Sequence, residues 1–150
     1  MKKLFLFGVT LVVGIIMGVV GTVFFYPFVF PPPVINEQVQ NVAQKQVFAT
    51  GTFIHPNPSD KLHWGKGSVS VYQQANQYEV FLNKNFEVGP GPAFYVYIST
   101  VPNIKTRSQF RQLLGTDKTV DLGALKSFKG SQVYAIPKSV DMQKIKSVVV

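Results

Sequence analysis

The sequence predicts a mainly β protein, in which an antiparallel β-sandwich or barrel-like domain follows one N-terminal transmembrane helix. Two patterns lead to this fold class. The first is an apolar run without charges near the N-terminus. The second is a series of about seven short apolar-alternating segments, separated by turn signals roughly every 8–12 residues. No long amphipathic helix pattern follows the apolar run, so we expect the remaining residues to form a β core.

The apolar run extends from Leu4 to Tyr26. As a helix rising ~1.5 Å per residue it reaches ~34 Å, which is enough for a hydrocarbon core of ~30 Å. A cleaved secretory signal is the alternative, but its apolar region is usually about 7–15 residues and precedes a small-x-small cleavage site, which this sequence lacks. A lipoprotein anchor is excluded because the chain has no cysteine. We predict an uncleaved signal anchor over residues 1–30, with its transmembrane helix at about 4–26.

The charges that flank the apolar run predict its orientation. Lys2 and Lys3 precede it, whereas residues 31–44 contain no Lys or Arg and one acid, Glu37. By the positive-inside rule, this asymmetry places the N-terminus in the cytoplasm and the later residues outside the cell membrane, as a single-pass protein. The spacing Gly14-x-x-x-Gly18 also allows close helix approach, so a weak helix-mediated dimer is an alternative to a monomeric anchor.

Residues 31–46 are predicted to link the anchor to the domain. Pro27 and the proline run at 31–33 should end the helix and begin an extended spacer. Residues 36–46 are polar and rich in glutamine. We expect this linker to lift the domain off the bilayer.

The domain itself is predicted to occupy residues 47–150. A first strand covers 47–54, where Gly51 marks a bulge or close packing. A hairpin follows at 68–83 and turns at 75–76. A rigid turn from Gly89 to Pro92 then precedes the central strand 94–99, because proline and glycine interrupt any regular ladder.

The second half of the domain continues with shorter elements. A short amphipathic helix is expected at 108–114, closed by Gly115. Strands are expected at 120–125 and 132–136. A helix start at Asp141 and the opening of a last strand at 147–150 complete the predicted order.

The ionisable side chains give little indication of catalysis. His55 and His63 flank a proline loop and, with Asp60, could form part of a metal site, although their spacing matches no compact metal motif. The alternative is two loop histidines with ordinary hydrogen bonds. The carboxylates give no close pair for acid–base chemistry, and Asp121 is expected to cap a turn. No cysteine nucleophile and no serine elbow is present, so nothing here indicates an enzyme.

Aromatic and basic residues suggest a binding surface as an alternative to simple packing. Trp64 is expected to stack on a ligand or to anchor the core. Five tyrosines alternate along the strands and are expected to share one aromatic face that binds an envelope polymer or a protein partner: Tyr72, Tyr78, Tyr95, Tyr97 and Tyr134. The basic residues are scattered, which favours solubility over attraction to anionic lipids or polymers, and we predict no nucleic-acid partner.

A series of small motifs runs through nearly the whole chain after residue 48. Their central residues are Gly51, Phe53, His55, Gly65, Gly67, Phe86, Gly91, Pro92, Tyr95, Asp121, Gly123, Gly130, Tyr134, Pro137 and Ser147. In order and spacing, these motifs resemble the electron-transfer DM-thirteen domain family. Members of that family are small β domains, found on bacterial membrane anchors and, in animals, beside DOMON domains.

The resemblance implies a redox role that rests on a nearly invariant cysteine in the strand after Ser-Val-Val. This chain ends at Val150 and contains no cysteine. We expect either a chain that lacks its last strand or a variant without the site, and favour the former because a bare apolar edge strand is normally avoided. A haem or metal would need His55 or His63 as a ligand, and no covalent attachment motif is present, so the cofactor stays unknown. Two functions remain: electron transfer through a cysteine or bound cofactor, and non-catalytic binding.

Overall fold

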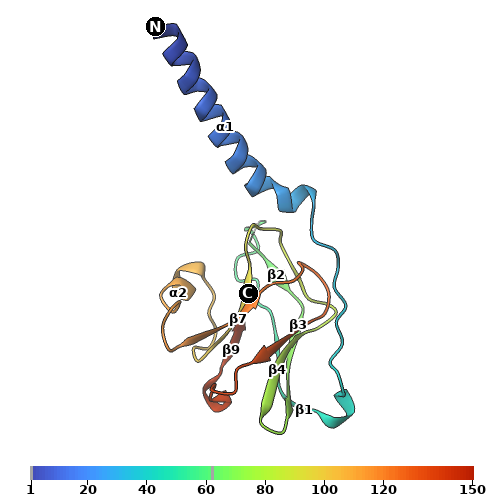
Figure 1. The fold of residues 1–150 in the computed structure, drawn as a ribbon. Helices are drawn as coiled ribbons and strands as arrows, with labels where there is room; N and C mark the ends of the chain where they lie inside the picture. The colour runs from blue at the N-terminus through green and yellow to red at the C-terminus, as the bar shows by residue number, and fades with distance from the viewer. Residues whose placement is uncertain (1, 62) are drawn as a thin grey trace. The chain divides into compact units, whose positions relative to one another are not determined.

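The computed structural model describes residues 2–61 and 63–150. Its contacts divide the chain into a helical unit and a β unit, the latter formed by Pro32–Gly89 and Ala93–Val150. Every pairing between the strands of the β unit is antiparallel. The predicted fold class, a mainly β domain after one N-terminal helix, is confirmed (Figure 1).

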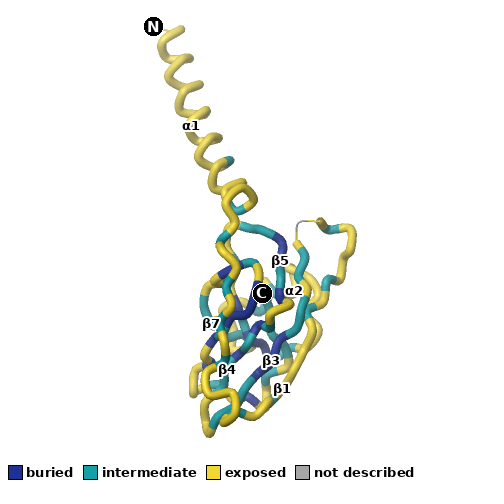
Figure 2. The backbone as a smooth tube through the Cα atoms, turned by 90° about the vertical axis from the view of Figure 1, so that its right-hand side faces the viewer, coloured by how far each residue is buried: buried dark blue, intermediate teal, exposed yellow. Residues whose placement is uncertain are grey.

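The helical unit contains α1, Lys2–Val29, in which no residue is buried (Figure 2). An 18-residue window of α1 has a mean hydropathy of 2.6, so the helix is long and apolar enough to cross a membrane. Of the prolines predicted to end the helix, Pro27 lies inside α1, which ends at Val29, just before the proline run at 31–33. Proline has a helical φ and removes only one hydrogen bond, and the amide of Phe30 still donates to the carbonyl of Tyr26 at 2.8 Å.

The largest sheet of the β unit has four strands in the order β1-β3-β4-β8. These strands are β1 (Gln46–Thr52), β3 (Ser68–Gln74), β4 (Gln77–Leu82) and β8 (Gln132–Ile136). The predicted hairpin over 68–83 is confirmed as β3 and β4. Its turn depends on Ala75, which has a φ of 50°. A left-handed residue of this kind matches the twist that a two-residue hairpin loop requires.

A second sheet has the order β7-β6-β9, with β6 (Tyr95–Ser99) between β7 (Thr119–Ala124) and β9 (Ser147–Val149). The prediction of a central strand at 94–99 is therefore confirmed. A small third sheet pairs β2 (Gly65–Lys66) with β5 (Glu87–Val88). Short helices complete the unit: η1 (Val42–Gln44), α2 (Arg107–Arg111) and η2 (Met142–Lys144), the last capped by Asp141 as predicted.

The core lies between the two larger sheets. Val80 and Leu82 from β4 and Val96 and Ile98 from β6 are fully inaccessible to solvent, as is Phe86. The rest of the core consists of Val69, Val71, Val88, Tyr134, Ile136 and Met142. In β4, β6 and β8 the core residues alternate with less buried ones, which explains why period-two patterns in the sequence locate these strands.

Strand β1 departs from strict alternation. A bulge lies between Val47 and Ala49, so Phe48 and Phe53 both pack against the core although an odd number of positions separates them. Gly51 is the close-packed position, because a Cβ there would lie 3.4 Å from the Val69 side chain. Of the two roles predicted for Gly51, close packing is the one the structure shows.

Candidate functional site

A short extended segment, residues 33–37, lies along the loop that leads into β8, and we call it the strap. Its backbone donates from Ile35 to the Lys129 carbonyl at 3.3 Å and from Glu37 to the Ser131 carbonyl at 2.9 Å. The hydroxyls of Ser127 and Ser131 donate to carbonyls of the strap, both at 2.7 Å. The strap thus joins the β unit within a stretch that sequence reasoning treats as linker.

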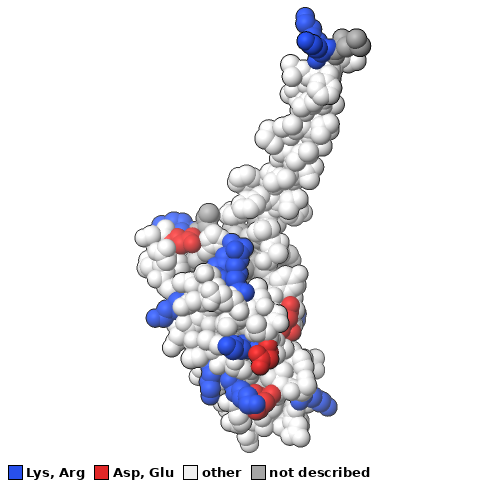
Figure 3. All heavy atoms as spheres, turned by 90° about the vertical axis from the view of Figure 1, so that its left-hand side faces the viewer, with Lys and Arg blue, Asp and Glu red and all other residues white. Residues whose placement is uncertain are grey.

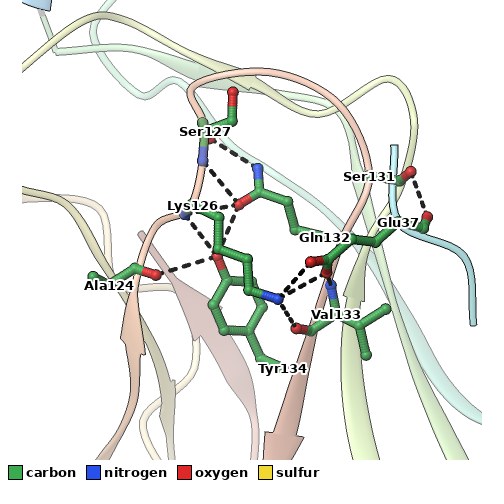
Figure 4. Close-up of polar contacts among 8 residues, drawn as sticks. All are labelled: Glu37, Ala124, Lys126, Ser127, Ser131, Gln132, Val133 and Tyr134. Atoms are coloured by element: carbon green, nitrogen blue, oxygen red, sulfur yellow. Dashed lines mark hydrogen bonds and ion pairs between the residues drawn. The ribbon is translucent and has the colours of Figure 1, made fainter. Parts of the chain in front are cut away.

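Glu37 fixes the end of the strap through its carboxylate (Figure 4). Lys126 Nζ donates to both carboxylate oxygens at 2.8 Å, and the Val133 amide donates to one of them at 2.7 Å. Burial alone would raise the pKa of Glu37, but the bonds from Lys126 and Val133 and the charge of Lys126 lower it below its ordinary value. The carboxylate is therefore ionised at neutral pH.

Behind this ion pair, Tyr134 and Gln132 form a buried polar network (Figure 4). The Tyr134 hydroxyl donates to Gln132 Oε1 at 2.8 Å, and Gln132 Nε2 donates to the Ser127 carbonyl at 2.8 Å. The amide of Lys126 donates to the Tyr134 oxygen at 3.1 Å. Burial raises the pKa of Tyr134, so its phenol stays protonated. A satisfied network of this kind holds the strap and supplies no free acid or base.

Sequence reasoning did not identify Lys126, Ser127 or Gln132 as site residues. A signal for Glu37 is present, because it is the only charged residue between Lys3 and Lys45. An isolated acid in such a stretch indicates a specific partner. Its partner Lys126 lies 89 positions away and could not be chosen from among the other lysines.

The two histidines lie in the loop between β1 and β2. His63 Nδ1 is 3.0 Å from the Asp60 carboxylate and its side chain is exposed. His55 is half-buried, and within the described residues its Nε2 atom is buried without a hydrogen-bond partner. Among residues 2–61 and 63–150, no group of three or more His, Cys, Asp and Glu side chains is placed to hold a metal ion. Of the two histidines, His55 is therefore the one whose buried ring nitrogen has no hydrogen-bond partner among the described residues.

Several glycines and aromatic residues of the predicted motifs gather around Phe86. The Phe53 and Phe86 rings are 5.2 Å apart, and the Gly130 amide donates to the Phe86 carbonyl at 3.1 Å. Gly67 has a φ of +107°, and a Cβ there would lie 2.5 Å from the Asn85 carbonyl oxygen. Gly65 packs on Val88 of β5. These residues form a structural corner that connects β2, β5 and the loop under the strap.

The remaining motif residues lie apart from this corner. Gly91 and Pro92 belong to the turn between β5 and β6, and Pro137 accepts the Val140 amide at 3.0 Å after β8. Asp121 accepts the Gly123 amide at 2.7 Å within strand β7, where the register with β6 shifts and Gly123 has a φ of +113°, so Asp121 stabilises an irregularity of the strand and not the turn that the sequence predicts. The motifs therefore specify turns and one strand irregularity at separate places in the fold.

The expectation that five tyrosines share one face is wrong. Tyr134 is buried in the core, and Tyr78 packs beside Phe48 with ring centroids 5.1 Å apart. Tyr95 and Tyr97 lie on the outer side of β6, because the alternating residues Val96 and Ile98 are buried on its inner side. Side chains alternate between the two faces of each strand, and the two sheets face the core from opposite sides. Tyrosines of different strands are therefore separated.

Tyr95, Tyr97 and Phe110 form a smaller aromatic surface, which we call the β6 surface. The Tyr95 and Tyr97 rings are 6.4 Å apart, and the Tyr97 and Phe110 rings are 5.0 Å apart. Tyr95 is 44% exposed. Burial, together with the charge of the Asp121 carboxylate and a hydrogen bond to it, raises the pKa of Tyr97. Two adjacent rings on an outer strand face can stack on a planar ligand or a sugar ring.

Comparison with known proteins gives one match. A family model described as "Electron transfer DM13" matches residues 53–150. No curated protein and no solved structure matches the chain.

Proposed function

Because this chain belongs to the electron transfer DM13 family, we propose that it is a membrane-tethered electron-transfer module whose β unit faces the extracytoplasmic side. The family match over residues 53–150 is the observation that carries the electron-transfer role. It covers all strands of the β unit except β1.

The anchor and its flanks support the tether and its orientation. Helix α1 carries no charge after Lys3, and its length and hydropathy suit a membrane span (Figure 3). Lys2 and Lys3 would remain in the cytoplasm by the positive-inside rule, so the β unit would be exported. Exported domains work in compartments where redox partners and envelope polymers are both present.

The chain contains no cysteine, so a thiol centre does not fit these 150 residues. His55 fits a bound metal or haem better than His63 does, because its Nε2 atom is buried and unpaired among the described residues, whereas His63 is engaged with Asp60. An imidazole with a free nitrogen is a common axial or metal ligand, and such a group would supply the one-electron chemistry.

Purification of the full chain from its own membrane tests this proposal. We expect a bound metal or a chromophore whose absorption changes between oxidised and reduced states. His55→Ala should lose it, and the matched variant His63→Ala should keep it. A native protein with no metal and no reducible chromophore would overturn the electron-transfer role.

The β6 surface favours a second candidate function, non-catalytic binding of an envelope polymer or protein partner. Its exposed Tyr95 and the adjacent Tyr97 form a stacking platform of the kind used for sugars. Binding of cell-wall glycan to the full chain should weaken in Tyr95→Ala. Tyr72→Ala is the matched control, because Tyr72 pairs with Phe81 on the other sheet. Equal binding by both variants would exclude this surface.

A further inference from the structure

The end of the β unit where the strap begins carries a mixed basic and aromatic surface. It consists of Lys66, Lys129 and the half-buried Trp64, and we call it the Trp64 patch. Lys66 Nζ lies 5.4 Å from the centre of the Trp64 ring, and the Gly89 amide donates to the Trp64 carbonyl at 3.0 Å. Next to the patch along the backbone, the Phe53 amide donates to the Gly67 carbonyl beside β2, and the following residue, Ile54, is 59% exposed.

The two lysines of the patch are positioned by one carboxylate. Glu87 of β5 lies 2.9 Å from Lys66 Nζ and 3.7 Å from Lys129 Nζ, one lysine at each oxygen. The side chains of Lys66 and Lys129 are 64% and 57% exposed, whereas that of Glu87 is 27% exposed. The two ammonium groups are therefore held close together at the surface. Together, the two lysines and Glu87 carry a net positive charge.

The strap connects this patch closely to the anchor along the chain. Ile35 of the strap bonds Lys129, the residue that also bridges to Glu87, so the patch adjoins the start of the strap. Val29 ends α1 and Pro33 makes the first strap contact. Three residues lie between them, and a fully extended chain spans at most ~3.6 Å per residue, so the covalent tether from Val29 to Pro33 is at most ~14 Å long.

We propose that the Trp64 patch docks on anionic lipid headgroups of the bilayer that α1 spans, an inference that rests on the proposed membrane tether. Paired ammonium groups attract phosphate, tryptophan partitions to the interfacial region, and an exposed isoleucine adds apolar contact at the acyl boundary. On the face drawn in Figure 3, basic and acidic side chains are interspersed. The consequence is a domain held against the membrane surface, where it meets partners in the same bilayer.

Trp64 is the only tryptophan of the chain, so its fluorescence reports the patch directly. The full chain is placed in nanodiscs of phosphatidylcholine, with or without phosphatidylglycerol and with lipids spin-labelled at the headgroup. We expect quenching of Trp64 that is stronger with the anionic lipid and weaker at high salt. Because each surface lysine favours anionic membranes about fivefold, Lys66→Gln and Lys129→Gln should each reduce docking severalfold.

Lys144→Gln is the matched control, since Lys144 is 73% exposed on η2 and pairs with Asp141, not with the patch. It should leave the quenching unchanged. Quenching that is independent of anionic lipid, salt and both patch lysines would overturn the docking proposal. A separate wash of membranes in alkaline carbonate tests the tether, because release of the chain would overturn the proposed anchor itself.

Discussion

Replacing Gly130 with alanine should detach the strap from the β unit. Gly130 has a φ of +96°, and an added Cβ would overlap the carbonyl oxygen of Ile35 and lie 3.0 Å from Val34 Cγ1. The obstructing oxygen belongs to the backbone, so it cannot rotate away as a flexible side chain would. The strap must therefore rise from the loop.

The magnitude follows from the hydrogen bonds that this movement breaks. The bond from Ile35 to Lys129 is already 3.3 Å long, and those from Glu37 to Ser131 and from Ser127 to Pro33 are 2.9 and 2.7 Å. At a net ~0.5–1.5 kcal/mol each, losing all three costs about 1.5–4.5 kcal/mol. Such a change increases the open population of the strap by a factor of about 10 to about 2,000.

Hydrogen exchange of the full chain, followed by mass spectrometry of peptides that cover residues 33–40, measures this opening. Gly123→Ala is the matched control, because Gly123 has a similar φ of +113° but no atom within 4 Å of an added Cβ. Both variants therefore carry similar backbone strain at a positive φ. Only in Gly130→Ala does the added Cβ also overlap the strap. Equal strap exchange in the two variants would refute the reasoning that Gly130 is required for strap docking.

Three further predictions concern the β unit. Gly67→Ala should lower the free energy of unfolding by about 3 kcal/mol or more in urea titrations, against about 1 kcal/mol for Gly115→Ala, because only Gly67 faces backbone atoms at 2.5 Å. The pKa of Glu37 is below its ordinary 4.5, so its stabilisation is present above about pH 4.5 and is lost as the pH falls through the lower folded value. Glu37→Gln should therefore show a smaller drop in melting temperature between pH 5 and 3 than the parent. Tyr134→Phe removes the bond to Gln132 at 2.8 Å and should cost about 1 kcal/mol, whereas Tyr95→Phe should change stability by less than about 0.5 kcal/mol. A Tyr134→Phe variant as stable as the parent would contradict the role given to the buried network.

The sequence by itself determined the features that depend on local pattern. A charge-free apolar run specifies one long helix, which is long and apolar enough to cross a membrane. Period-two alternation located the central strand and the hairpin, since successive side chains of a strand point to opposite faces. The motif order after residue 48 also indicated the family, which the match over residues 53–150 confirms.

Only the tertiary structure decided the features that depend on partners far apart in the chain. The bulge at Phe48 and the separation of the tyrosines follow from how strands pair and which side of each sheet faces the core. Glu37 meets Lys126 across 89 positions, and Gly130 lies in close contact with the backbone of the strap at Ile35. A local pattern gives a residue its preference for helix, strand or turn, but its partner is chosen by the packing of the whole β unit.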